Sequence, residues 1–439
     1  MGVFYSDVLM KPVLQLALDL VNLDRAIRIA TDAVKGGVDW LEAGTPLIKS
    51  EGMECIRKLK KTFPQRVIVA DMKTMDTGAL ETEMASKAGA DIVSILGAAD
   101  DTTISDAVKS ARRYGSRIMV DFISTIPTPE RVKRLEGIGV DYFCVHVGID
   151  EQMIGRKPLD SLMLLTKRTR LPVAVAGGIN SETAGLMVKK GASIIIVGGA
   201  IIKARDVAKA AKVIKKAITT GSVIKTDMFK KYDESGLINA FKRVSTPNIS
   251  DAMHRGGAMH GIKPLKLGYH MVGKARTVRT VDGDWAKPVE AIDTAAAGEV
   301  IVVDAGGGGT AVWGELATLT AKKHGLAGVV IDGSVRDVDD IVKMDFPVFS
   351  RYVSPNAGEP KGFGEIGVEI VCGGQTVRNG DWVIGDDSGV VVVPSEQAQE
   401  IANRALDVRE QENRIREEIK EGGSLGDVLK LRRWEKIIG

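Results

Sequence analysis

The stretch VIVADMKTMDTGALETEMASKAGADIVSILGAADDTTISDAVKSARRYGSRIMVD, residues 67–121, alternates short apolar runs with longer segments rich in Ala, Lys and Glu. The apolar runs Val67–Asp71, Asp91–Leu96 and Arg117–Asp121 predict strands. Asp101–Tyr114, between two of them, has the pattern of an amphipathic helix. Strands that alternate with helices of this length indicate a parallel sheet.

The same alternation continues on both sides of this stretch. Strands are expected at Val13–Asp19, Val38–Glu42, Asp141–His146, Pro172–Ala176 and Ser193–Val197, and helices at Leu23–Lys35 and Val207–Ile218. Eight strand–helix units in about 200 residues indicate a closed (β/α)₈ TIM barrel near the lower size limit of that fold. A doubly wound open sheet is the rival, but it usually has fewer strands.

The second half of the chain has a different pattern. Thr219–Ser222 is interpreted as a break, residues 223–243 look helical with polar interruptions, and Ser245 is expected to cap a helix whose first turn holds Pro247. Strand-like pieces in a Gly-rich background follow at Glu299–Asp304, Ala327–Asp332, Ile366–Cys372 and Gly389–Val393. A long charged helix comes last, at about Ser395–Glu421. We therefore expect a barrel over residues 1–218, a linker over 219–234 and a second α/β domain over 235–439.

Length and composition limit the classes of protein to consider. With 439 residues the chain has room for two or three domains, and 44% hydrophobic and 27% charged residues exclude a disordered chain. The net charge of +3 gives no electrostatic reason to expect nucleic acid as a partner. Three widely spaced cysteines make no disulfide framework, which fits a reducing cytoplasm, and no apolar run reaches the roughly 18 residues of a membrane span.

Ionisable residues end several of the predicted barrel strands, where barrel enzymes carry their chemistry. Asp19, Glu42 and Asp71 end the first three strands, His146 ends the sixth, and the motif DMKTMD adds Lys73 and Asp76. Each residue alone could cap a helix or fill a structural role. Together they would converge on one cavity, where burying several carboxylates without a cation is costly. Glu42 and Asp71 are therefore predicted to bind a divalent hard cation.

Two glycine pairs, Gly177–Gly178 and Gly198–Gly199, follow strands seven and eight. Phosphate binds at this place in many barrels, because backbone N–H groups face the ligand there. A phosphate beside a metal and carboxylates predicts a sugar phosphate and proton removal next to its carbonyl, with Mg²⁺ holding the ene-diolate oxygens. His146 is the expected general base or acid. Lys73 could instead form a Schiff base, but its carboxylate neighbours would keep it charged.

The segments LQLALDL, LEAGTPLIKSEG, VADMKTMD, CVHVG, VAGGI and IVGGAI resemble 3-hexulose-6-phosphate synthase, of the orotidine-monophosphate decarboxylase superfamily. The resemblance covers nearly all of residues 13–218. It implies the reversible aldol addition of formaldehyde to ribulose 5-phosphate, with Mg²⁺, or Mn²⁺ in its place, at Glu42 and Asp71. It also implies that Lys73 and Asp76 contact the intermediate, that His146 transfers a proton, and that Asp76 reaches the site of a partner barrel in an obligate dimer.

The closest rival activity is that of 3-keto-L-gulonate-6-phosphate decarboxylase, which shares the D-x-K-x-x-D motif. That relative places an Arg shortly after its strand-six His and another where this chain has Gly199. Here Val147, Gly148 and Ile149 follow His146, and both differences favour the synthase. They leave open which side chain neutralises the phosphate, and Lys203 and Arg205 are the candidates.

A second group of candidate residues lies in GGGGTAVWGELATLTAKKHGLAGVVIDGSVRDVDD, residues 306–340. The run Gly306–Gly309 permits close approach to an anion but equally fits a mobile turn. Arg336 can hold a carboxylate by two parallel hydrogen bonds, and Asp337 or Asp340 can hold Mg²⁺. This combination suits a 2-oxo acid, although a solvated surface ion pair explains the residues about as well.

STPNISDAM, WGELAT, GVVIDGSVRD and the closing SLGDVL resemble the RraA-like family over about residues 235–432. That family has a swivelling-type α/β domain and includes regulators of ribonuclease E and 4-hydroxy-4-methyl-2-oxoglutarate aldolases. The resemblance implies Mg²⁺ near Asp337, a pyruvate carboxylate on Arg336, and a trimer. The segment around Glu315 would supply backbone contacts, and an acidic residue of another subunit would assist; the residues concerned are Gly314, Glu315, Leu316 and Ala317, with Glu410 and Glu412 as acidic candidates.

Two classes of function compete for this second domain: a metal-dependent lyase of a small oxo acid, and a non-catalytic regulator that binds a ribonuclease. Because a surface regulator needs no Arg-Asp site, Arg336 and Asp337 favour the lyase. A barrel that dimerises and a second domain that forms trimers would together build a larger assembly such as a hexamer.

Overall fold

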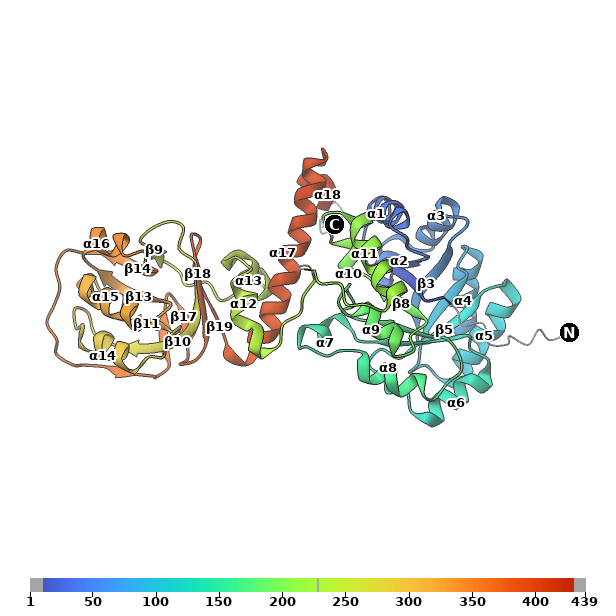
Figure 1. Cartoon of the computed structure of the whole chain (residues 1–439), viewed down its shortest axis with the longest axis horizontal. Helices are drawn as coiled ribbons and strands as arrows, with labels where there is room; N and C mark the ends of the chain where they lie inside the picture. The colour runs from blue at the N-terminus through green and yellow to red at the C-terminus, as the bar shows by residue number, and fades with distance from the viewer. Residues whose placement is uncertain (1–10, 227–228, 430–439) are drawn as a thin grey trace, which may run out of the picture. The chain divides into compact units, whose positions relative to one another are not determined.

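The computed structural model describes residues 11–226 and 229–429 and divides into two compact units (Figure 1). The first unit contains the chain up to Gln152, Arg156–Lys231 and the chain from Glu410 onwards. The second contains Met153–Gly155 and Tyr232–Arg409. The two ends of the expected domains, 1–10 and 430–439, and positions 227–228 of the expected linker lie outside the described residues.

Eight parallel strands close the first unit into a barrel in which β1 pairs with both β2 and β8. The predicted barrel is therefore confirmed, and the open sheet is excluded. Each strand lies within two residues of its expected bounds at its start and within three at its end: β1 Val13–Leu18, β2 Trp40–Ala43, β3 Val67–Thr74, β4 Ile92–Leu96, β5 Arg117–Asp121, β6 Tyr142–His146, β7 Val173–Ala176 and β8 Ile194–Val197.

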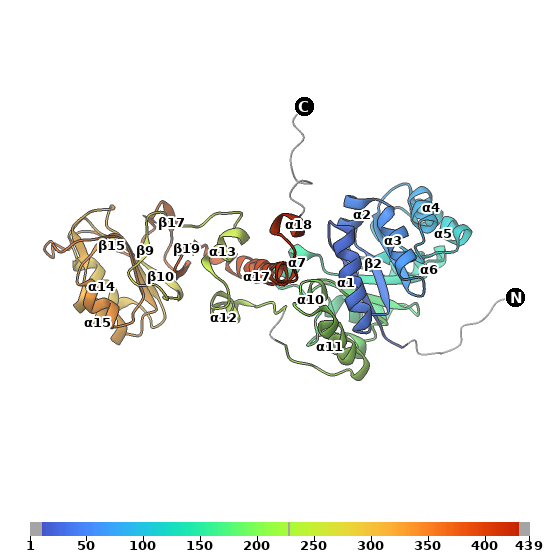
Figure 2. The ribbon, with the colours of Figure 1, turned by 90° about the horizontal axis from the view of Figure 1, so that it is seen from above.

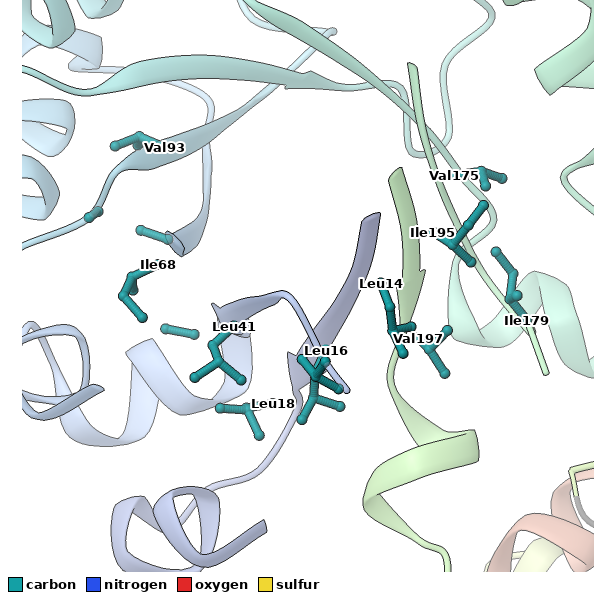
Figure 3. Close-up of a cluster of buried hydrophobic side chains, with 14 of the residues drawn as sticks. Leu14, Leu16, Leu18, Leu41, Ile68, Val93, Val175, Ile179, Ile195 and Val197 are labelled. Carbon is teal, nitrogen blue, oxygen red and sulfur yellow. The ribbon is translucent and has the colours of Figure 1, made fainter. Parts of the chain in front are cut away.

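Alternate residues of the barrel strands face opposite sides, as the period of two of a strand requires. One set packs outward against the helices, and Figure 3 shows Leu14, Leu16 and Leu18 of β1 in this layer with Leu41 of β2. The other set fills the barrel interior and is almost entirely apolar: Val13, Ala17, Val69, Ile92, Met119, Tyr142, Cys144, Ala174, Ala176, Ile194 and Ile196. The interior is therefore a packed core, and the site has to lie at its end.

Helices cover the outside of the barrel. The first, α1 (Leu23–Lys35), begins at Asn22, whose side chain accepts a hydrogen bond from the Arg25 amide at 2.8 Å, and it has the expected bounds. The others are α2 Thr45–Glu51, α3 Glu54–Thr62, α4 Gly78–Lys87, α5 Asp101–Tyr114, α6 Pro129–Ile138, α7 Ile149–Met153, α8 Leu159–Thr166, α9 Ala184–Lys189, α10 Gly199–Ile202 and α11 Val207–Thr220.

The segment after α11 corrects the sequence prediction. Residues 223–243 were expected to be helical, but within the described residues only η1 (Glu234–Gly236) and α12 (Leu237–Phe241) form helical turns there. Ile224 instead exchanges hydrogen bonds with Ser181, at 3.1 Å and 2.8 Å, and the Thr226 amide donates to Glu182. Because these tertiary bonds satisfy the backbone, the chain leaves the helix at Gly221 and has no regular secondary structure from Ser222 to Thr226.

The second unit contains a mixed sheet with the strand order β19-β18-β10-β11-β13-β14-β9. Its central strands β10, β11, β13 and β14 are parallel, and its outer pairs are antiparallel. The bounds are β9 Lys263–Pro264, β10 Met271–Arg279, β11 Val300–Asp304, β12 Ala311–Trp313, β13 Gly328–Val335, β14 Val348–Val353, β15 Glu365–Ile366, β16 Ile370–Cys372, β17 Gln375–Val377, β18 Trp382–Asp386 and β19 Gly389–Val393. The single strand expected over Ile366–Cys372 is thus two short ones.

Of the helices of this unit (Figure 2), the sequence predicted the one that Ser245 caps and the long charged one that begins near Ser395. Ser245 caps α13 (Thr246–Ala252) in a capping box with Asn248, with Pro247 in the first turn as predicted. The remaining helices are α14 Ala286–Thr294, α15 Glu315–Lys323, α16 Val338–Lys343, η2 Ser395–Gln397, α17 Ala398–Lys420 and α18 Leu425–Leu429. Among the described residues no helix combines the length and the apolar character that crossing a membrane requires.

Candidate functional site

At the carboxyl end of the barrel interior, polar side chains replace the apolar ones that fill the rest of it. Asp19 directly follows β1 in the same alternation as Val13 and Ala17, and Glu42 and Asp71 occupy the interior positions of β2 and β3. Parallel strands of a closed barrel all end at the same rim. The three carboxylates predicted from the sequence therefore meet at one place.

Glu42 and Asp71 are buried, Asp19 is half-buried, and the charges of the three act on one another. Burial, and then the negative charge of Asp71, raise the pKa of Asp19 above its ordinary value. Burial and the charges of Asp71 and Asp19 raise the pKa of Glu42 well above its usual range. Gln15, fully buried one layer deeper, donates its Nε2–H to Glu42 Oε2 at 2.5 Å. The electrostatics of this rim favour an additional positive charge.

Lys73 supplies part of that charge. Its Nζ lies 2.8 Å from Asp71 Oδ2 and 3.4 Å from Asp121 Oδ2. The register of β3 on β4 shifts between Ala70 and Thr74, and Lys73 has a φ of 48°, so the strand bends locally. Burial alone would lower the pKa of Lys73, but Asp71 and Asp121 raise it above its ordinary value. Lys73 is therefore held as a cation, which disfavours a Schiff base.

His146, at the end of β6, is paired with a residue that the sequence prediction missed. Its Nδ1 lies 2.8 Å from Asp121 Oδ2, at the end of β5. Burial alone would raise the pKa of Asp121, but His146 and Lys73 hold it below its ordinary value. Because the ionised Asp121 can only accept, this hydrogen bond places a proton on Nδ1 of His146, and in the neutral imidazole the lone pair is then on Nε2.

The glycine pairs lie beside this cluster. Gly177 and Gly178 have φ angles of 108° and 65°, and a Cβ on Gly177 would lie 2.5 Å from the Val147 carbonyl oxygen. A Cβ on Gly198 would lie 3.2 Å from Asp19 Oδ2, so β8 ends against the same carboxylate. Gly199 begins α10. Of the two candidate cations, Lys203 offsets part of the rise in the pKa of Asp19, whereas the charge of Arg205 acts on Glu417 of α17.

Asp76 is the one predicted barrel residue that the structure does not bring to the cluster. It lies exposed between β3 and α4, and its Oδ1 accepts a hydrogen bond from the Thr77 amide at 2.6 Å. The neighbouring apolar side chains Met75, Leu80 and Met84 are exposed as well. In a single chain, Asp76 therefore belongs to a surface and not to the cavity.

Glu42 and Asp71 fit a divalent cation by the chemistry of the donor set. Mg²⁺ is usually held by one or two carboxylates, with water and substrate oxygens completing its shell. The described residues contain no group of three or more His, Cys, Asp and Glu side chains arranged to hold a metal. Two buried carboxylates, Glu42 with a raised pKa and Asp71 paired with Lys73, match the donor set of such an incomplete site.

The second unit also gathers most of its predicted residues. Arg336 follows β13, and its Nε lies 3.4 Å from Asp337 Oδ2. Asp337 has a φ of 57°, caps α16, and accepts a hydrogen bond from the Glu315 amide at 3.1 Å. A Cβ on Gly314 would lie 2.6 Å from Asp337 Oδ2, so a larger residue here would displace this carboxylate. Gly314, the amide of Glu315 and the Arg336–Asp337 pair thus lie together at one place on the surface.

Other predicted residues of the second domain lie apart from this pair. Asp340 is exposed and pairs with Lys343 on its own helix, at 2.9 Å. Leu316 is 72% exposed, whereas Ala317 packs against the core. Glu412 pairs with Arg416 on α17 at 2.8 Å, and Glu410 begins the part of α17 that belongs to the first unit.

Comparison with known proteins finds a family match for each half of the chain. Residues 12–214 match the Orotidine 5'-phosphate decarboxylase / HUMPS family, and residues 246–392 match the RraA-like family, described as Aldolase/RraA. The 3-hexulose-6-phosphate synthases of Bacillus subtilis (strain 168) and Mycobacterium gastri are 40% and 41% identical to this chain over 209 and 205 residues. Each match covers 47% of this chain and 99% of the relative.

A solved structure of the RNA-processing inhibitor RraA from Thermus thermophilis is 29% identical, with a TM-score of 0.32, and covers 34% of this chain and 92% of its own. The two family matches confirm the resemblances seen in the sequence motifs of both halves. This chain belongs to the Orotidine 5'-phosphate decarboxylase / HUMPS family through its barrel, which is similar to 3-hexulose-6-phosphate synthase, and carries an RraA-like domain in its second half.

Proposed function

We propose that the barrel catalyses the reversible, Mg²⁺-dependent aldol addition of formaldehyde to ribulose 5-phosphate, which gives 3-hexulose 6-phosphate. The observation that carries the proposal is the convergence of Asp19, Glu42, Asp71, Lys73 and the His146–Asp121 pair at one rim. It is supported by relatives named 3-hexulose-6-phosphate synthase, which match over 99% of their length.

In the proposed reaction His146 moves the proton. Nε2 removes a proton from C1 of ribulose 5-phosphate, next to the C2 carbonyl, and an ene-diolate forms. C1 then attacks the carbon of formaldehyde, the new C–C bond forms, and the former carbonyl oxygen of formaldehyde takes up a proton. Asp121 holds the imidazole in the tautomer that this requires, at 2.8 Å from Nδ1. Mg²⁺ bound by Glu42 and Asp71 would supply positive charge for the ene-diolate oxygens.

The other residues orient the substrate. Lys73, kept charged by Asp71 and Asp121, stabilises negative charge as it develops. Asp19 lies between the carboxylate cluster and Gly198, and it is suited to bind a substrate hydroxyl group. The phosphate is assigned to Gly177–Gly178 and Gly198–Gly199, with Lys203 as its cation. Asp76 is assigned to the site of a partner barrel, a role that its exposure in the single chain supports.

The test is an assay of purified full-length chain with formaldehyde and ribulose 5-phosphate, with and without EDTA. We expect turnover that EDTA abolishes and Mg²⁺ or Mn²⁺ restores. 3-Keto-L-gulonate 6-phosphate is supplied in parallel, since its decarboxylation would identify the rival activity. Turnover that persists after complete metal removal would contradict the assigned role of Glu42 and Asp71.

For the second domain we propose a Mg²⁺-dependent lyase of a pyruvate-derived 2-oxo acid. The Arg336–Asp337 pair beside the amide of Glu315 carries this proposal, because Arg can bind a carboxylate while Asp337 contributes to a cation site. Calorimetry with pyruvate and Mg²⁺ tests it. If pyruvate does not bind, the regulator that binds a ribonuclease becomes the better explanation, because such a surface needs no oxo-acid site.

A further inference from the structure

The first unit contains a buried charge cluster made by the last turns of α17. Glu418 Oε1 accepts hydrogen bonds from Arg25 of α1, at 2.9 Å, and from Arg414 Nε, at 3.0 Å. The exposed fractions of the three side chains are 15% for Arg25, 9% for Arg414 and 6% for Glu418. A charge group this deeply buried is costly to form unless its partners are well placed. It therefore fixes the end of α17 on the barrel.

Arg414 extends the cluster to the rim of the barrel. Its Nη1 donates to the carbonyl oxygen of Arg205 at 3.2 Å. Arg205 is two residues beyond Lys203, in the loop that joins α10 to α11. The segment between β8 and α11, residues 198–206, thus meets Asp19 through Gly198 at one end and is held by α17 through Arg205 near the other.

The 3-hexulose-6-phosphate synthases match the first half of this chain, so the match contains no counterpart of α17. The family match ends at residue 214, and 47% of this chain already covers 99% of the Bacillus subtilis and Mycobacterium gastri enzymes. The segment from Glu410, which belongs to the barrel unit, lies outside that match. This barrel therefore uses a helix of the second half of the chain to hold a loop of its own site.

We propose that Arg414 and Glu418 are positioning residues of the sugar-phosphate site, which hold the β8–α11 loop so that Gly198, Gly199 and Lys203 meet the phosphate. The inference rests on the proposed function. Arg414 does not touch substrate and acts through the carbonyl of Arg205. It follows that loss of this contact weakens phosphate binding and leaves the proton transfer at His146 intact.

The test uses the full chain with Arg414→Ala and Arg414→Lys. Lysine keeps a charge for Glu418 but lacks the planar fork that reaches Glu418 and the Arg205 carbonyl together. The matched control is Arg416→Ala, on the same helix, because Arg416 is exposed and its bonds go to Asn413 and Glu412 of that helix. KM for ribulose 5-phosphate, KM for formaldehyde, kcat and the melting temperature are measured for all four proteins.

Both Arg414 variants should raise KM for ribulose 5-phosphate on the order of tenfold, with kcat and KM for formaldehyde within about twofold of the parent. Arg416→Ala should match the parent. A parental KM for ribulose 5-phosphate in the Arg414 variants overturns the inference, and so does an equal rise in both KM values with a fall in kcat. If Arg414→Ala does not fold, Arg414→Lys decides.

Failure of the proposed function would look different, because the parent itself would then be inactive. In that case the dissociation constant of inorganic phosphate is measured by calorimetry on the same four proteins. Weaker binding confined to the Arg414 variants sustains the positioning role. Equal binding in all four, or binding absent from the parent, rejects it.

Discussion

The two candidate sites of this chain differ in how their charged groups are held. In the barrel, the Asp71 and Asp121 side chains are only 10% and 4% exposed, and Lys73 joins them. In the second unit, Arg336 and Asp337 are 46% and 39% exposed. Buried charges interact strongly and fix one another, whereas exposed ones are screened by water. The barrel site is thus organised before ligand binds, and the second needs a ligand or another surface to exclude water.

The largest effect should come from Asp71→Ala, which removes a buried carboxylate that is proposed to hold the cation. We expect turnover of formaldehyde and ribulose 5-phosphate to fall about a thousandfold or more, since the ion and the Lys73 position are lost together. The fold should persist, because Lys73 keeps Asp121 as a partner at 3.4 Å. The control is Asp106→Ala, an exposed carboxylate on α5. Full activity in a folded Asp71→Ala protein would reject the assignment.

Asp121→Asn should have the next largest effect, because it should change which ring nitrogen of His146 carries the proton. An amide can donate to Nδ1, which moves the imidazole proton to Nε2 and removes the base from the substrate side. We expect kcat to fall on the order of a hundredfold, with little change in KM for ribulose 5-phosphate. The measurement is the pH profile of kcat. A profile and rate like those of the parent would mean that the pair at 2.8 Å does not serve proton transfer.

The residue Asp121 also shows where sequence reasoning reached its limit. The alternation along the strands was enough to predict eight strands, the barrel, and the meeting of Asp19, Glu42 and Asp71. Asp121 ends a predicted strand in the same interior alternation as Met119, so the signal was present. It was missed because an Asp at a strand end is also a common helix cap, and nothing local distinguishes the two roles.

Contacts between distant parts of the chain were beyond prediction for a different reason. Residues 223–226 have helix-compatible composition, but their hydrogen bonds go to Ser181 and Glu182, more than 40 positions earlier. The central strand β10 was not predicted either, because Lys274 and Arg276 interrupt its apolar run and only pairing with β11 and β18 defines it. The local sequence pattern carries no information on hydrogen-bond or strand partners that are distant in the chain.

In the exposed site, Arg336→Ala should weaken pyruvate binding by about tenfold or more, because the bidentate carboxylate contact is lost. Its matched control is Arg378→Ala, an exposed arginine paired with Glu369. Melting temperatures of both variants should stay close to that of the parent, since Arg336 is 46% exposed. Calorimetry that finds equal pyruvate affinity in Arg336→Ala and Arg378→Ala would remove the oxo-acid assignment.

The smallest effect concerns stability and follows from Glu42, whose pKa is raised above the value of 4.5 that an unfolded chain provides. Between the unfolded and the folded pKa, the folded protein binds more protons, so stability without metal falls as pH rises through this window. The pKa of Asp19 is also raised, so its contribution to stability also falls as pH rises. Glu42→Gln removes the buried charge and should stabilise the metal-free protein by about 1 kcal/mol at pH 8, and by less at pH 5.

Melting temperatures in EDTA at pH 5 and pH 8 measure this effect, with the exposed Glu369→Gln as the control. Added Mg²⁺ should raise the melting temperature of the parent mainly at pH 8, because the carboxylates must be ionised to bind it. The same addition should do little for Glu42→Gln. The contrary outcome is that Glu42→Gln destabilises the metal-free protein equally at pH 8 and pH 5. That result would mean that Glu42 serves packing and the hydrogen bond with Gln15. The contrast between a charged, prearranged barrel site and an open second site would then lose its basis.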